Sequence, residues 1–273
     1  MARILVWSLL LVIGKQVAHS YNTQFQGSRR DWINRVALTP FIATTSIASA
    51  ATGPTDGNLP ELPPEAVRSY LQYRIPLQTS SDFYIFELRE LLEDINSWGE
   101  VGELFQANNN RGQGNPSRIE REFTNVFRIL GLSMPPEYAE EMRDAQFAFE
   151  RAMGKISKAT AGVRRDLPVE LDKSLVPTAL EGWEEGRVAL NSFFVILNNA
   201  TGLKEMHGIP PYGPNQKKEY GRSERRYLDL KKKVKLCQNR GGPTLSQAWG
   251  QLMVSGYLQD SCGIPDLDAY FYQ

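Results

Sequence analysis

Hydrophobic residues between positions 81 and 203 recur every three or four residues, which is the spacing of one face of an α-helix. Polar or Gly/Pro-rich segments divide this region into four stretches, and each is predicted to be one helix. The helices are expected to begin at Ser81, at Pro116-Ser117, at Pro135-Pro136 and near Val169. No stretch of comparable length alternates between apolar and polar positions, so the sequence predicts an all-α fold.

The apolar stripes of the four stretches are the expected core. They consist of Tyr84, Leu88, Leu91, Ile95 and Trp98; Ile119, Phe123, Val126 and Leu130; Tyr138, Met142, Ala145, Phe149, Ala152 and Ile156; and Leu180, Trp183, Leu190, Phe194 and Leu197. Short connections favour an up-down-up-down four-helix bundle over residues 81–203. Pro177 lies inside the fourth stretch and is expected to kink or interrupt it.

Segments on either side of this region have a different composition. Residues 51–80 are rich in Pro and Gly and are expected to form an extended leader with one short helix over residues 65–75. Residues 204–216 are expected to be a linker. Residues 217–273 are predicted to form a basic C-terminal extension with a small helical part of its own.

The first fifty residues resemble targeting segments. Residues 1–20 carry one arginine, a short apolar run and small residues, which is typical of a secretory signal peptide; the alternative is an N-terminal core helix. Residues 21–50 are basic and hydroxylated like a transit peptide. They also contain a twin-arginine pattern, in which a pair of arginines precedes an apolar segment and a small-residue cleavage site, formed by Arg29, Arg30, Ala48 and Ala50.

Signals stacked in this order suit a protein that crosses several membranes. A signal peptide, a transit peptide and a twin-arginine segment together predict delivery to the thylakoid lumen of a plastid of secondary origin. The mature protein is then expected to begin near Ala51.

The charge is unevenly distributed along the chain. The 273 residues carry 31 Lys and Arg against 31 Asp and Glu, and 41% are hydrophobic, as in an ordinary globular protein. Residues 51–203, however, contain 15 basic and 23 acidic residues, whereas residues 217–240 contain ten basic and three acidic ones. The neutral total therefore combines an acidic helical region with a basic extension.

Few residues are available for metal, redox or nucleophilic chemistry. The chain has two His and two Cys, and no His lies within the predicted bundle, whereas a di-iron bundle needs Glu-x-x-His on two helices. A Gly-rich phosphate loop and a Cys-x-x-Cys-His haem motif are also missing. Adjacent carboxylates such as Glu184 and Glu185 point about 100° apart on a helix, which favours a solvated face. The sequence thus predicts no catalytic residue, no metal site and no cofactor, and the protein is not expected to be an enzyme.

Two features of the extension have alternative interpretations. Cys237 and Cys262 are predicted to form a disulfide in an oxidising compartment, worth about 3 kcal/mol, or else to remain two free thiols. The basic run is suited to phosphates, to an anionic membrane or to acidic protein loops, of which acidic loops are favoured and nucleic acid is disfavoured. The alternative is a solvated helix face without a partner.

Targeting, helical architecture and the proline-rich leader together resemble the PsbQ-like extrinsic proteins of photosystem II. The start at Ala51, the segment over residues 62–92 and the added basic extension are most similar to the diatom-type fifth extrinsic subunit. The resemblance implies a non-catalytic subunit, peripheral to the lumenal side of the thylakoid membrane. Such a subunit shields the oxygen-evolving manganese–calcium cluster, helps to retain calcium and chloride, and contacts the photosystem II core and neighbouring extrinsic subunits.

Docking on this partner is assigned to the leader and to the basic extension. The candidate residues are Pro60, Pro63, Pro64, Arg68, Arg74, Lys217, Lys218, Arg225, Arg226, Lys231, Lys232, Lys233 and Lys235. Two other functions remain open at this stage, namely a lumenal assembly factor for photosystem II and a secreted helical binding protein.

Overall fold

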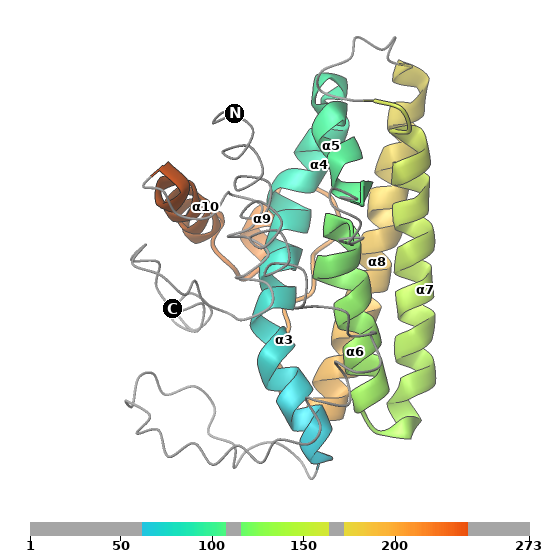
Figure 1. Ribbon diagram of the computed structural model, residues 1–273, viewed down its shortest axis with the longest axis vertical. Helices are drawn as coiled ribbons and strands as arrows, with labels where there is room; N and C mark the ends of the chain where they lie inside the picture. The colour runs from blue at the N-terminus through green and yellow to red at the C-terminus, as the bar shows by residue number, and fades with distance from the viewer. Residues whose placement is uncertain (1–61, 108–115, 164–171, 240–273) are drawn as a thin grey trace, which may run out of the picture. The chain divides into compact units, whose positions relative to one another are not determined.

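A computed structural model of the protein describes residues 62–107, 116–163 and 172–239. Within these ranges every regular element is a helix and no strand is present, which confirms the all-α prediction. The longer helices are α3 (Pro64–Phe83), α6 (Asn125–Ser133), α7 (Pro136–Ala159) and α8 (Val176–Thr201); α6 contacts both α3 and α7, and α7 and α8 are in contact over most of their lengths (Figure 1). The targeting residues Arg29, Arg30, Ala48 and Ala50 lie outside the described residues.

The first helix starts earlier than predicted. It begins at Pro64, where proline suits the first turn of a helix, and continues through a π-helical turn, η2 (Tyr84–Leu88), into α4 (Arg89–Glu93). Ser81 is therefore buried inside a helix and is not its N-cap, which corrects the prediction. The predicted short helix over residues 65–75 is the first half of this same helix, and the leader ends near residue 63.

Two hydroxyl side chains explain why the polar residues before Ser81 do not break the helix. Thr79 Oγ1 donates to the Ile75 carbonyl at 2.9 Å, and Ser80 Oγ donates to the Pro76 carbonyl at 3.0 Å. Hydroxyls that bond back to the carbonyl four residues earlier are satisfied within the helix and leave it intact. Ser81, the predicted cap, follows these residues inside the helix, and its hydroxyl lies 2.9 Å from that of Tyr220.

The end of the first predicted helix also differs. Asp94 has an extended backbone, and its side chain accepts a hydrogen bond from the Asn96 amide at 3.1 Å. It thereby starts a 3₁₀ turn, η3 (Ile95–Ser97), followed by α5 (Trp98–Phe105). Ile95 and Trp98 therefore belong to a second, short segment instead of continuing the stripe of Tyr84 and Leu88.

The second and third predicted helices are confirmed. Ser117 and Glu120 form a reciprocal capping box, in which the Glu120 amide donates to Ser117 Oγ at 3.2 Å and the Ser117 amide donates to Glu120 Oε2 at 2.8 Å. The helix continues through a π-helical turn, η4 (Glu120–Thr124), into α6. Helix α7 begins at Pro136, as predicted.

The fourth helix is shorter than predicted. Asp172 accepts a hydrogen bond from the Ser174 amide at 2.9 Å and starts a 3₁₀ turn, η5 (Lys173–Leu175), before α8 begins. Pro177 consequently lies in the first turn of α8, where its missing N–H has no intrahelical partner to lose. The predicted stretch is thus interrupted just before Pro177, which is one of the two expected outcomes, and Pro177 lies at the start of α8 instead of kinking it.

Gly186 permits a close approach between α8 and the first helix. Tyr84 donates from its hydroxyl to the Trp183 carbonyl at 2.6 Å, and a Cβ added at Gly186 would overlap that hydroxyl and lie 2.7 Å from Met153 Cε. The absence of a side chain at Gly186 thus makes room for the buried Tyr84 hydroxyl.

Gly186→Ala is expected to lower the free energy of unfolding by about 1–2 kcal/mol, because overpacking outweighs the better helix propensity of alanine. Gly154→Ala is the matched control, since nothing lies within 4 Å of the added Cβ on α7, and it is expected to be neutral or stabilising by up to about 1 kcal/mol. Urea unfolding of both variants measures the difference. Equal effects would contradict the close approach, whereas adding Tyr84→Phe to Gly186→Ala should reduce its cost.

Candidate functional site

A segment without regular structure fastens the C-terminal extension to the helical body. Asn198 exchanges two hydrogen bonds with the backbone of Met206, at 3.0 and 3.1 Å, and Asn191 exchanges two with the backbone of Ile209, both at 2.7 Å. Arg187 also donates to the Ile209 carbonyl at 2.9 Å. The predicted linker over residues 204–216 is thus bound along α8 in this part.

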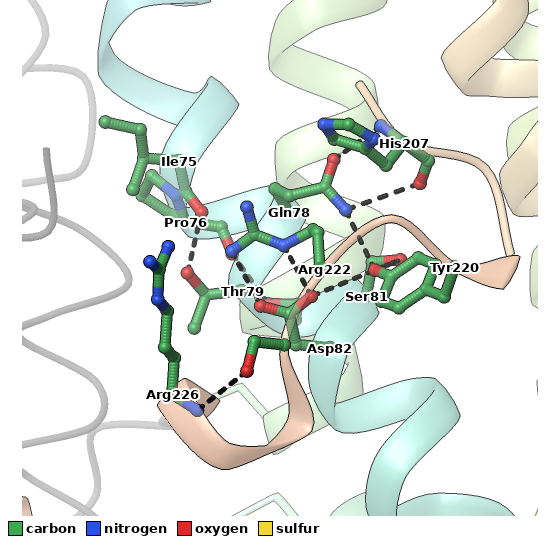
Figure 2. Close-up of polar contacts among 12 residues, drawn as sticks. Ile75, Pro76, Gln78, Thr79, Ser81, Asp82, His207, Tyr220, Arg222 and Arg226 are labelled. Carbon is green, nitrogen blue, oxygen red and sulfur yellow. Dashed lines mark hydrogen bonds and ion pairs between the residues drawn. The ribbon is translucent and has the colours of Figure 1, made fainter. Parts of the chain in front are cut away.

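Gln78 connects this segment to the first helix. Its Oε1 accepts a hydrogen bond from the His207 amide at 2.7 Å, and its Nε2 donates to the Tyr220 hydroxyl at 2.9 Å (Figure 2). Both polar atoms of a fully buried amide are therefore satisfied by residues more than a hundred positions away.

Asp82 is the centre of the polar cluster in Figure 2. Its carboxylate has no exposed surface and accepts two hydrogen bonds from the Arg222 guanidinium, at 2.7 and 2.8 Å. The Tyr220 hydroxyl donates to Asp82 Oδ1 at 2.9 Å, and Ser81 Oγ lies 2.9 Å from the same hydroxyl. A bidentate, buried arginine–carboxylate pair fixes both the position and the orientation of its partners.

The tyrosines of the cluster are held in the neutral form. Burial raises the pKa of Tyr220 well above its usual range, and the nearby Asp82 carboxylate raises it further. The pKa of Tyr227 is also raised, first by burial and then by the Glu87 carboxylate. Neutral hydroxyls can donate hydrogen bonds to carboxylates at any physiological pH, so the Tyr220–Asp82 and Tyr227–Glu87 hydrogen bonds persist.

In its described part, up to residue 239, the extension has the helices α9 (Gln216–Glu219) and α10 (Glu224–Asn239). One face of α10 packs against the body through Tyr227, Leu230 and Val234, all of which are buried. The Phe86 ring lies 5.7 Å from the Tyr227 ring. Helix α10 therefore has a hydrophobic seam of its own and is fixed to the body.

Several of the predicted docking residues are used inside the molecule. Arg74 is buried and pairs with Glu205 at 3.3 Å. Lys217 bridges two carboxylates, those of Glu90 and Glu224. Lys231 pairs with Glu87 at 2.6 Å, and these contacts link the extension to the first helix.

Most of the other candidates are exposed. The exposed ones among the described residues are Pro63, Pro64, Arg68, Lys218, Arg225, Arg226, Lys232, Lys233 and Lys235. Pro60 and Cys262 lie outside the described residues, and Cys237 lies within α10 without a described side chain. The cysteine pairing thus stays a prediction.

Sequence reasoning missed the residues that bind the extension to the body. These are Gln78, Asp82, Asn191, Asn198, Tyr220 and Arg222. The run from residue 74 to residue 86 mixes Arg, Gln, Thr, Ser and Asp with apolar residues, and this composition does not indicate that the run is covered on both sides. All thirteen of these residues are buried, since the body covers one side of the helix and the extension covers the other.

His207 gives the cluster a pH dependence. Its pKa is lowered by burial first and by the nearby Arg222 charge second, and the Asp82 carboxylate offsets these effects in part. Because the unfolded chain then takes up the proton first, stability should decrease as the pH falls from about 6.5 towards the lower pKa of the folded state, and level off below it.

We expect a shallow decrease, because His207 is partly exposed. The measurement is the free energy of unfolding in urea between about pH 7.5 and about pH 5, with the His207 pKa followed by NMR. His207→Gln should remove part of the slope, whereas His19 remains in both proteins as a common background. A folded-state His207 pKa above its usual value would contradict the expectation.

The described residues form no group of three or more His, Cys, Asp or Glu side chains placed to hold a metal ion. In the same part of the chain, no helix combines the length and apolarity needed to cross a membrane.

Comparison with protein-family models, with curated proteins and with solved structures gave no significant match. The described residues are characterised by a cationic helix, α10, that is fastened to a helical body through the Asp82 cluster.

Proposed function

We propose that this protein is a non-catalytic extrinsic subunit on the lumenal face of photosystem II. In this role it covers the oxygen-evolving manganese–calcium cluster and helps to retain calcium and chloride. The observation that carries the proposal is the fixed α10 helix with its exposed cations, taken together with the targeting pattern over residues 1–50.

The body is proposed to serve as a rigid spacer. Its long helices are proposed to form an up-down-up-down four-helix bundle, consistent with the contacts of α7 with α8 and of α6 with both α3 and α7. A stiff body with one charged helix attached to it presents its cations in a constant geometry. Binding then loses little side-chain and backbone entropy, which favours a stable cover.

Docking is proposed to be mainly electrostatic. The exposed cations Lys218, Arg226 and Lys233 belong to the extension, and Arg68 belongs to the first helix. These residues are proposed to bind acidic loops of the photosystem core and of neighbouring extrinsic subunits. A subunit bound in this way slows ion loss and excludes reductants by covering the cluster, and it performs no bond-making step.

Sequencing the mature N-terminus and washing isolated thylakoids with salt together test the proposal. The mature chain should begin near Ala51, and about 1 M salt should release the protein into the wash, because exposed ion pairs are screened at that concentration. A start near Tyr21, with the protein outside the plastid, would instead favour a secreted binding protein. The protein should also copurify with mature photosystem II at about one copy per reaction centre; presence only on immature complexes would identify an assembly factor.

A further inference from the structure

Helix α10 has two apolar surfaces, of which only one is explained by the fold. Leu230 and Val234 are buried against the body, whereas Leu228 and Leu236 are 48% and 45% exposed. The two exposed leucines are eight residues apart, which is about 12 Å along a helix. The body gives them no partner that buries them.

Cations lie between and beside the exposed leucines. At 100° per residue, an arc of about 100° on the outward side of α10 contains Leu228, Lys232 and Leu236 in one row, with Lys235 and Arg225 close to it. All three cations are exposed. Two acids of α10 flank the arc, namely Asp229, which is exposed, and Glu224, whose side chain is 38% exposed and pairs with Lys217. The arc therefore combines a net positive charge with two half-exposed leucines.

We propose that this arc of α10 binds the surface of a bilayer that contains anionic lipids. The cations would contact headgroup phosphates while the two leucines enter the boundary between headgroups and acyl chains. Lysine side chains suit this position, because their aliphatic stems lie along apolar surface and their ammonium groups reach the phosphates.

An acidic protein surface fits the arc less well. Carboxylates would pair with Arg225, Lys232 and Lys235 but would leave Leu228 and Leu236 in a polar environment. A bilayer interface offers anionic groups and acyl chains at neighbouring depths, so it satisfies both kinds of side chain. Arg226 and Lys233 lie on the other edge of the helix, without an exposed leucine beside them, and stay available for a protein partner.

Contacts within the free protein fix the orientation of α10. Its buried seam, the Asp82–Arg222 pair and the Lys231–Glu87 pair hold the helix with the arc outward. The arc therefore needs no folding step on the membrane, in contrast to an amphipathic segment that becomes helical only when it binds. This inference goes beyond the proposed function and does not depend on the photosystem.

Cosedimentation of the full chain with vesicles tests the inference. The vesicles contain either phosphatidylcholine alone or phosphatidylcholine with about 30% phosphatidylglycerol, in about 50 mM and about 500 mM NaCl. Stronger binding to the anionic vesicles at low salt is expected. All variants carry the same first fifty residues, so a difference between variants belongs to the substituted positions.

Two pairs of variants separate charge from leucine insertion. Arg225→Gln/Lys232→Gln/Lys235→Gln should weaken partitioning to anionic vesicles about a hundredfold, whereas the matched Lys158→Gln/Lys173→Gln/Lys204→Gln, in which three exposed lysines elsewhere are neutralised, should retain most of it. Leu228→Ser/Leu236→Ser should weaken it roughly tenfold with an unchanged salt dependence. Leu132→Ser removes a leucine that is 82% exposed in the last turn of α6 and should change nothing.

Three results would overturn the inference. The first is an absence of preference for anionic vesicles at low salt, and the second is an equal loss in the two sets of charge variants. The third is unchanged vesicle binding by Leu228→Ser/Leu236→Ser together with equally tight retention on immobilised poly-glutamate, which would assign the arc to an acidic protein. Circular dichroism melting of each variant verifies that the fold is retained. Because thylakoids are not used, failure here leaves the salt-wash test of the proposed function independent.

Discussion

Asp82→Ala is expected to lower the free energy of unfolding by about 3–5 kcal/mol. Removing the carboxylate leaves the Arg222 guanidinium in a site where its side chain is only 8% exposed, and it leaves Ser81 Oγ as the remaining nearby acceptor for the Tyr220 hydroxyl. An uncompensated buried charge costs far more than the lost attraction of the pair. Urea unfolding followed by circular dichroism measures the loss.

Limited proteolysis adds a second measurement, because the lost pair joins α3 to the segment before α10. Cleavage within residues 216–239 should become faster in Asp82→Ala, while α7 and α8 remain protected. Removing both charges, in Asp82→Leu/Arg222→Met, should recover part of the stability, since neither charge is then buried alone.

Glu90→Gln is the matched control for Asp82→Ala. Glu90 also joins the first helix to the extension, through Lys217 at 2.8 Å, but its side chain is 63% exposed. An exposed ion pair contributes about 0–1 kcal/mol, so this variant should be close to wild type. A loss as small in Asp82→Ala as in Glu90→Gln would contradict the assignment of the Asp82 cluster as the fastening of the extension.

Trp183→Ala is expected to lower the free energy of unfolding by about 3–5 kcal/mol as well. The Trp183 indole is fully buried on α8 and stacks on the Tyr84 ring at a centroid distance of 5.5 Å. Its Nε1 donates to the Tyr84 carbonyl at 3.0 Å, at the first residue of the π-helical turn. Alanine would leave a large cavity and a buried carbonyl without this donor, and both effects destabilise the fold.

Trp183→Phe and Val188→Ala are the comparison variants for Trp183→Ala. Phenylalanine keeps much of the ring but lacks the N–H, so its loss should lie between those of the wild type and Trp183→Ala. Val188 is 51% exposed on the outer side of α8, and its truncation should cost less than about 0.5 kcal/mol. In thermal and urea unfolding, the loss of stability should be largest for Trp183→Ala, intermediate for Trp183→Phe and smallest for Val188→Ala. Equal losses for Trp183→Ala and Val188→Ala would show that the Tyr84–Trp183 contact does not stabilise the body.

Helices with one covered face could be predicted from the sequence. In α7 the apolar positions Met142, Phe149 and Ile156 recur every seven residues and are buried, while half of the twelve positions between them carry charged or amide side chains. Proline at the start of the helix adds a local signal. Both signals are contained within neighbouring residues, so they do not depend on the rest of the chain.

The first helix could not be predicted correctly for the opposite reason. Between residues 74 and 86 it is covered on all sides, so no apolar stripe faces one core and no polar stripe faces water. Polar residues such as Thr79 and Ser81 then resemble a loop or a cap. Their partners lie in the helix itself or in the extension, and only the folded chain brings the extension to them.

The sequence by itself determined the helical class, the boundaries set by Pro135-Pro136 and Ser117, the shortage of His and Cys and the uneven charge. Only the tertiary structure decided which charges face outward, because the partners are far apart in the chain: Asp82 and Arg222 are separated by 140 positions. A pattern of charges gives their number and local spacing. Burial and pairing, which decide whether a cation fastens the fold or faces a partner, depend on the contacts that folding makes.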